Sequence, residues 1–291
     1  MTPLCCRAFI AACRDELDAP KPGNVHVYAA GHRMTVAEFE DSAVAAAGPL
    51  CAQGARVGVR IRAAIEATNR AVGTNTNLGI VLLCAPLAAA AERALAAPAA
   101  AGGDLRACLT RVLDGLDVAD AADAFAAIVQ AAPAGLGHAA QHDVFAPPQV
   151  TLKEAMTAAA DRDLVARQYA TAFADVFDLG MPLHVAATAR GRDPKLATLA
   201  VYLGFLSRFP DSHILRKHGA AAAREVRRTA QRFDALLDET GDPASLFPQL
   251  LAWDRSLKAQ GLNPGSSADL TVATLFGIRL QSGLPSTHIS G

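Results

Sequence analysis

The amino-acid sequence predicts an all-α protein built as one large multi-helix domain, and three observations carry this prediction. Apolar residues recur at spacings of three and four along most of the chain, as on one face of a helix. Residues typical of helix starts and helix ends separate these stretches. No alternating run of β-branched residues predicts a strand. With 291 residues, of which 52% are hydrophobic, the chain can bury a sizeable core.

Capping boxes mark two of the expected helix starts. Thr35 with Glu38, and Thr151 with Glu154, have the spacing at which a hydroxyl and a carboxylate satisfy free backbone N–H groups. The expected helices span, in order, residues 4–17, 35–52, 57–71, 77–98, 104–116, 119–131, 151–178, 182–190, 194–208, 213–238, 243–259 and 266–282.

Proline and glycine mark further boundaries in the second half of the chain. The pairs at 193–194 and 242–243 each place an N-cap aspartate before a proline at the first helical position, and Gly180, Gly191 and Gly261 stand where helices end. The longest expected break between helices spans residues 133–149. If the domain divides into two helical halves, we expect the division there and nowhere else.

Composition limits the classes of function. A net charge of -1 gives no global attraction to nucleic acid or to an acidic membrane, so we expect neither as a partner. The apolar run at 78–91 is too short to span a bilayer and predicts a buried helix. No secretory signal is recognisable, and the six cysteines lack metal-binding spacing, which predicts reduced core thiols in a cytoplasmic protein. Homo-oligomerisation stays open.

Polar residues interrupt the helical pattern in four segments, 21–26, 73–79, 211–219 and 263–270. Each lies at an expected helix boundary, where free N–H groups and the positive end of the helix dipole favour phosphate. Pockets of all-α proteins form where helix ends converge, so we expect these segments to line one nucleotide pocket. Glycine-rich phosphate loops of the Rossmann and Walker types are absent from the sequence.

The order of these motifs resembles a known family. KPG at 21–23, TNT at 74–76, DSHILRKHG at 211–219 and NPGSSADL at 263–270 are similar to segments of triphosphoribosyl-dephospho-CoA synthases. This resemblance implies an all-α enzyme that joins ribose C1 of ATP to the 2'-hydroxyl of 3'-dephospho-CoA and releases adenine. The product of that family supplies the prosthetic group of acyl carrier subunits. Mg²⁺ is expected to arrive with ATP, since it usually shares phosphates with one or two carboxylates.

Two of the segments depart from that family's pattern. Better-known members resemble KPGLVD and NTHKG, whereas this chain has KPGNVH at 21–26 and NTNLG at 75–79. A candidate acid and a candidate cation are therefore missing. We keep two alternatives open beside the synthase: a related ribosyl transferase that acts on a different cofactor precursor, and a non-catalytic helical nucleotide-binding regulator.

The first two segments supply candidate nucleotide ligands. Lys21 is expected to meet a phosphate, with Asn24 and His26 on the ribose or base; the alternative is a stiff turn between helices. Asn75 and Asn77 are expected beside a phosphate, and the alternative is that one of them caps the following helix.

The last two segments supply candidate catalytic groups. Asp211 is our first choice for the carboxylate that stabilises the sugar cation or takes the hydroxyl proton, and Asp269 is the second. The donor that meets the leaving adenine is expected to be His213, Asn24 or His26. The alternative for Asp211 is a helix cap. Arg216, Lys217, Ser266 and Ser267 complete the candidate nucleotide ligands.

A metal site is a further candidate. Asp161 and Asp163 bring two carboxylates close together in sequence, and the alternative is a charged helix surface with internal ion pairs. His138, His142 and Asp143 have no paired spacing on one helix and are expected in a loop.

Overall fold

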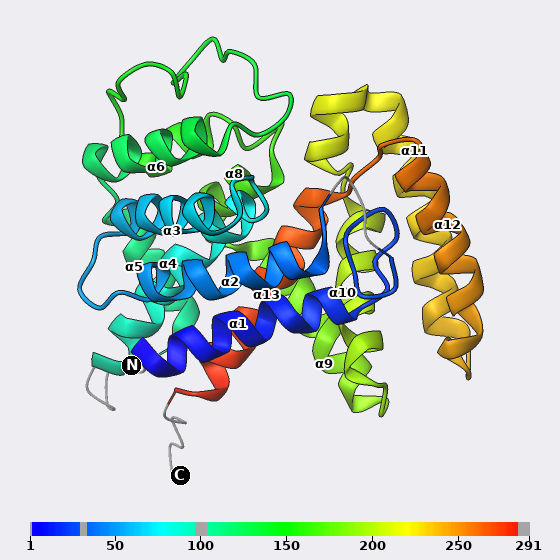
Figure 1. Ribbon diagram of the computed structural model, residues 1–291. Coiled ribbons are helices and arrows are strands. Elements are labelled where there is room, and N and C mark those ends of the chain that lie inside the picture. Colours follow the sequence, from blue (N-terminus) through cyan, green and yellow to red (C-terminus); the bar gives the residue numbers. More distant parts are fainter. Residues whose placement is uncertain (1, 30–33, 97–103, 285–291) are drawn as a thin grey trace, which may run out of the picture.

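The computed structural model describes residues 2–29, 34–96 and 104–284, and over these residues the protein is all-α (Figure 1). An isolated bridge between His26 and Ala29 is the strand-like pairing found in this part of the chain. The helices are α1 Thr2–Asp18, α2 Val36–Leu50, α3 Val57–Val72, α4 Leu78–Ala96, α5 Leu105–Asp114, α6 Val118–Ala131, α7 Leu152–Thr157, α8 Leu164–Ala170, α9 Met181–Ala189, α10 Pro194–Arg208, α11 Ser212–Glu239, α12 Phe247–Ala259 and α13 Gly265–Ser282.

The predicted helix starts are confirmed by their hydrogen bonds. Both capping boxes form, with the Thr35 side chain accepting from the Glu38 N–H and the Thr151 side chain accepting from that of Glu154. Asp193 caps α10 through the N–H of residue 195. These local signals fix the residues at which α2, α7 and α10 begin. They thereby also fix where the segments that precede these helices end.

Helix α4 lies in the middle of the larger core. It packs against α3, α5 and α13, and its residues include many of the fully buried apolar side chains. It is long and apolar enough to cross a membrane, and 72% of its most apolar stretch is buried inside the protein. The prediction of a buried helix at 78–91 is therefore confirmed, while the expected end at 97–98 lies outside the described residues.

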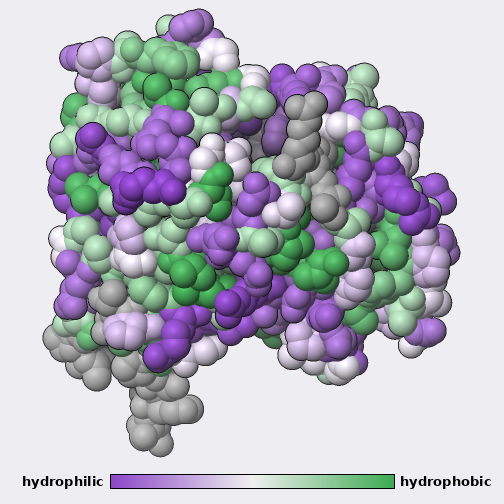
Figure 2. Space-filling model, in the orientation of Figure 1, coloured by the Kyte–Doolittle hydropathy of each residue, from purple (hydrophilic) through white to green (hydrophobic). Residues whose placement is uncertain are grey.

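Buried apolar residues form two clusters. The larger one is built mainly from α1 to α8 and α13, with a few residues of α9 and α10, and the smaller one is built from α9 to α13. Figure 1 shows α11 and α12 on one side, α3 and α6 on the other, and α13 between them. The clusters interleave along the chain, because Val201 and Phe205 of α10 belong to the larger one while the α10 residues around them belong to the smaller one. On the face drawn in Figure 2, hydrophobic and hydrophilic residues are interspersed.

The helix predicted at 151–178 is wrong as one continuous element. The chain forms α7, α8 and a π-helix, η2, over Val176–Gly180. Asp163 starts α8 as its N-cap, and Ala172 and Phe173 have positive φ angles of 50° and 59°, which end it. The alanine-rich sequence does not indicate this break, because the two residues in the left-handed backbone conformation are not glycines.

Two further expectations are corrected. Helix α11 is interrupted at Gly219, whose φ of 83° and ψ of 173° are non-helical and suit glycine. Cys5 and Cys51 form a disulfide, with their Cα atoms 5.9 Å apart, because α1 packs along α2 and brings its start to the end of that helix. Cys6, Cys13, Cys84 and Cys108 are free thiols.

Candidate active site

A cavity of about 1190 Å³ lies where the starts of α4, α8, α11 and α13 come together. Residues from all four polar segments line it, among them Asn24, Asn75, His213 and Asp269. The stretch from Gln130 to Val144 contributes much of the remaining wall. A helix start carries the positive end of the helix dipole, so the convergence of four starts favours negatively charged ligands near the cavity.

Asp211 ties two of these helix starts together and is fully buried. Its Oδ1 accepts from the N–H groups of His213 (3.0 Å) and Ile214 (3.2 Å), and its Oδ2 accepts from the N–H and the hydroxyl of Ser267 (both 2.8 Å). The capping alternative is therefore what the geometry shows. Burial raises the pKa of Asp211 and the four hydrogen bonds oppose that rise. Neither Asp211 nor Ser267 is among the residues that line the cavity.

Asp269 faces the cavity from the first turns of α13 and is packed against the start of α4. A Cβ atom on Gly79 would lie 2.0 Å from Asp269 Oδ2, so only glycine leaves room for this carboxylate. Burial raises the pKa of Asp269 well above its usual range, and the nearby carboxylates of Asp211, Glu16 and Asp163 raise it further. Asp269 is thus a carboxylate that holds its proton to unusually high pH.

His213 occupies the same wall in a similar way. A Cβ atom on Gly265 would lie 2.6 Å from His213 Nδ1, so the glycine of the NPGSS motif makes room for the imidazole. Ser266 also lines the cavity, and its hydroxyl oxygen accepts a hydrogen bond from the Ser212 hydroxyl at 3.0 Å. Pro264 gives α13 no side-chain cap, and Asp211 takes that role in part by accepting from the Ser267 N–H.

Cations line the side of the cavity that α11 forms. Arg216 pairs with Asp163 at 3.3 Å and donates to the backbone oxygen of Ala134 at 3.2 Å. Lys217 is exposed on the same wall, and Arg162 adds a third positive charge. These groups supply the charge that a polyphosphate needs.

The two carboxylates predicted as metal ligands have separate positions. Asp163 lines the cavity, but its Oδ1 caps α8 by accepting from Val165 N–H (2.9 Å) and Ala166 N–H (3.1 Å). Asp161 is exposed and is not part of the cavity lining. Within the described ranges, no group of three or more His, Cys, Asp or Glu side chains is arranged to hold a metal ion. The spacing suggested a paired site because helix capping by Asp163 was not anticipated.

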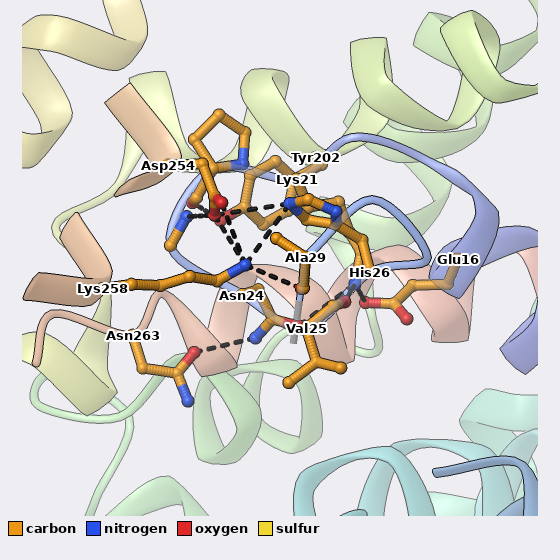
Figure 3. Close-up of polar contacts among 12 residues, drawn as sticks. Glu16, Lys21, Asn24, Val25, His26, Ala29, Tyr202, Asp254, Lys258 and Asn263 are labelled. Carbon is orange, nitrogen blue, oxygen red and sulfur yellow. Dashed lines mark hydrogen bonds and ion pairs between the residues drawn. The ribbon is translucent and has the colours of Figure 1, made fainter. Parts of the chain in front are cut away.

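Lys21 is not among the residues that line the cavity, which corrects the position expected from the sequence. Figure 3 shows its contacts with neighbouring residues. Its side chain is fully buried, forms an ion pair with Glu16, and donates to Asn24 Oδ1 (3.1 Å) and the Val25 backbone oxygen (2.7 Å). Burial lowers the pKa of Lys21, and the contact with Glu16 opposes that shift. Asn24 does reach the cavity, where its Nδ2 donates to Asn263 Oδ1 at 2.8 Å.

His26 is also buried and is held by α12 (Figure 3). Its Nε2 lies 3.3 Å from Asp254 Oδ1, and the same carboxylate oxygen accepts from the Gly23 N–H at 2.9 Å. Lys258 donates to Asp254 Oδ2 (3.0 Å) and to the Ala29 backbone oxygen (2.9 Å). Burial lowers the pKa of His26. Asp254 and Lys258 of α12 therefore hold the loop at residues 23–29 in place.

The asparagines before α4 combine both of the roles considered. Asn75 Oδ1 accepts from the Leu78 N–H at 3.2 Å and caps the helix, while the residue also lines the cavity. Asn77 is buried and donates to Thr68 Oγ1 at 3.0 Å. Its Oδ1 has no hydrogen-bond partner among the described groups, although it too belongs to a lining residue.

Sequence reasoning missed Glu16, Asn263, Asp254 and Lys258. Glu16 lies five residues before Lys21 at the end of an expected helix, and Asn263 opens the NPGSS motif, so proximity to the motifs was the available signal. Asp254 and Lys258 are four residues apart on one helix face and reach the loop only through tertiary packing. No local pattern indicates that contact.

Comparison with known proteins gives a consistent picture. A family model described as ATP:dephospho-CoA triphosphoribosyl transferase matches residues 5–288. A curated relative from Citrobacter koseri, described as a probable 2-(5''-triphosphoribosyl)-3'-dephosphocoenzyme-A synthase, is 35% identical over 98 residues. That match covers 33% of this chain and 31% of the relative.

A crystal structure from Archaeoglobus fulgidus, described as a candidate triphosphoribosyl-dephospho-CoA synthase, has a similar fold. The TM-score is 0.59 at 21% identity, and the superposition covers 84% of this chain and 98% of that chain. At this identity the likeness shows the fold.

Proposed function

This chain belongs to the ATP:dephospho-CoA triphosphoribosyl transferase family, and we propose that it transfers the triphosphoribosyl group of ATP to the 2'-hydroxyl of 3'-dephospho-CoA with release of adenine. The observation that carries the proposal is the cavity itself, in which a carboxylate, a histidine and several cations meet at convergent helix starts. We also propose that the reaction takes place in the cytoplasm.

The size of the cavity suits two large substrates. Pockets for one drug-sized ligand span roughly 300–1,000 Å³. At about 1190 Å³, this cavity exceeds that range, and it combines a polar wall with apolar residues such as Phe39, Phe125 and Met156. A direct transfer needs donor and acceptor together, and such a cavity accommodates both.

The triphosphate is proposed to lie along α11. Arg216, Lys217 and Arg162 line that wall, and the starts of α11 and α13 direct positive dipole ends toward it. Lys21 is covered, so its contribution to nucleotide binding passes through Asn24 and Glu16, which do reach the cavity. Asn75 and Ser266 provide further polar groups on the same wall.

Asp269 is the proposed general base. Breaking the bond between ribose C1 and adenine builds positive charge on the sugar, while the attacking hydroxyl must lose a proton. A carboxylate with a raised pKa is, in its ionised form, a stronger base than an ordinary aspartate, and burial and acidic neighbours raise the pKa of Asp269 in this way. Asp211 already accepts four hydrogen bonds from two helix starts, so Asp269 replaces it as the first candidate for the catalytic carboxylate. His213 is proposed to assist the departure of adenine.

Mg²⁺ is proposed to enter as part of the ATP complex. The described residues build no cage of three or more ligands, which agrees with an ion held mainly by substrate phosphates and one or two carboxylates. Asp163 is the carboxylate that the cavity offers beside the cations.

The test is incubation with ATP, Mg²⁺ and 3'-dephospho-CoA, with adenine followed by chromatography and the product by mass. We expect adenine release that requires all three components and a product equal to both substrates minus adenine. Adenine release with other acceptors but not with dephospho-CoA would indicate a different cofactor precursor. ATP binding without any adenine release would indicate a non-catalytic regulator.

A further inference from the structure

Glu16 has an unusual position for an acid at the end of an apolar helix. Its side chain is only 5% exposed, yet the residue lines the cavity beside Asn24. Oε1 forms the ion pair with Lys21, and the structure gives Oε2 no hydrogen bond to any described residue. One oxygen of this carboxylate is therefore fixed, and the other remains for a molecule in the cavity.

Lys21 explains how a buried carboxylate can stay charged there. An ammonium group has three N–H donors, and those of Lys21 are directed to Glu16, Asn24 and the Val25 backbone oxygen. Burial raises the pKa of Glu16, and the direct contact with Lys21 opposes that rise. Because every donor is used inside the protein, the charge of Lys21 acts on Glu16 rather than on a phosphate.

Two of the carboxylates that line the cavity, Glu16 and Asp269, have different surroundings. Asp269 has three acidic neighbours, whereas Glu16 is in direct contact with a lysine. When the environments of two titratable groups differ in this way, one suits proton transfer and the other suits a lasting negative charge.

We propose that Glu16 is a second catalytic carboxylate, which rests on the function proposed above, and that it faces ribose C1 and stabilises the positive charge on the sugar. The bond from C1 to adenine N9 breaks with its electron pair going to adenine, and the bond from C1 to the acceptor oxygen forms. The hydroxyl proton passes to Asp269, adenine takes up one proton from water, and Asp269 returns its proton to water, so the reaction neither gains nor loses protons overall. Glu16 exchanges no proton in this step and contributes its negative charge.

The test compares matched variants by single-turnover adenine release and by calorimetric titration with ATP and Mg²⁺. Glu16→Gln removes the charge and keeps the shape and an acceptor for Lys21. The double variant with Glu16→Gln and Lys21→Met also removes the lysine charge, so it contains no buried lysine without an acidic partner. Glu92→Gln is the control, because Glu92 forms another largely buried ion pair, with Arg60, away from the cavity.

We expect the Glu16→Gln rate to fall about 100- to 1,000-fold. ATP affinity should be unchanged or higher, because a negative charge near the triphosphate is removed. The double variant should stay equally slow while folding normally, and Glu92→Gln should keep the wild-type rate. If Glu16→Gln retains the wild-type rate, or if the double variant recovers it, then Glu16 has only a structural role and the proposal is wrong.

The wild-type arm separates this inference from the proposed function. A wild-type protein that releases no adenine refutes the transferase itself, and the role of Glu16 in it. A wild-type protein that turns over beside an equally active Glu16→Gln variant leaves the transferase standing and refutes the inference alone.

Discussion

The loop cluster, formed by Lys21, His26, Asp254 and Lys258, and the wall of the cavity contain the same kinds of side chain in different surroundings. In the loop cluster each charged group meets an opposite charge inside the protein, and the side chains of Lys21, His26 and Asp254 are buried. On the wall, Asp269 has acidic neighbours and Lys217 is exposed. Charged residues near a motif therefore divide into those that hold the backbone and those that face a ligand, and only the second kind is expected to act on substrate.

The largest expected effect is on catalysis, at the wall. Replacing Asp269 with Asn removes the proposed base without adding volume against Gly79, so the rate of adenine release should fall by about 10²- to 10⁴-fold. Circular dichroism should show unchanged helix content. Asp161→Asn is the matched control, because that carboxylate is exposed outside the cavity. Equal rates for wild type and Asp269→Asn would remove Asp269 from the chemistry.

The next largest effect is on stability, in the loop cluster. Lys21→Ala leaves Glu16 buried without its partner, and breaking a buried ion pair costs about 3–5 kcal/mol of unfolding free energy. Urea unfolding measures this loss. Lys153→Ala breaks an exposed pair with Asp114 and should cost about 1 kcal/mol or less. A Lys21→Ala protein as stable as the control, but with weakened ATP binding, would put Lys21 back among the direct ligands.

A smaller effect is expected on binding. Lys217→Gln removes one charge from the wall of the cavity, which should cost about 1.5–3 kcal/mol of ATP binding energy if the lysine meets a phosphate. The loss should shrink as salt is raised, because the cation is exposed. Arg224→Gln, on the same helix beyond Gly219 and outside the cavity lining, is the control. Calorimetry that gives the two variants the same affinity would argue against a phosphate site along α11.

The smallest effect is a pH dependence of stability. The pKa of Asp269 is higher in the folded protein than in the unfolded chain, so folding favours its protonated form. Its stabilising contribution is complete below the unfolded pKa and is lost as pH rises through the raised folded pKa. Asp269→Asn should therefore gain thermal stability relative to wild type as pH is raised from 4 to 8. A difference in melting temperature that is independent of pH would show that this carboxylate is not strained by its neighbours.

The sequence was sufficient for the helices and for the segments that meet at the cavity. Capping boxes, Asp–Pro pairs and terminal glycines act within a few residues, so α2, α7 and α10 begin where local rules place them. The break between α7 and η2 was not predicted, because Ala172 and Phe173 adopt left-handed backbone conformations that their side chains do not indicate.

The candidate site could be predicted by segment but less well by side chain. Asn24, Asn75 and Asp269 reach the cavity, whereas Lys21, His26 and Asp211 are covered. The residues that cover them come from distant parts of the chain. Asp254 in α12 accepts a hydrogen bond from the Gly23 N–H, and the Ser267 hydroxyl in α13 donates one to Asp211. Spacing within one motif carries no information about such partners.

The most direct test of the division between loop cluster and cavity wall is a crystal structure with Mg²⁺, dephospho-CoA and an ATP analogue whose bond between ribose and adenine resists cleavage. The triphosphate should lie beside Arg216 and Lys217, with ribose C1 facing Asp269. Lys21 should keep its contact with Glu16 and remain covered. A nucleotide bound outside this cavity, or a phosphate in direct contact with Lys21, would contradict the account.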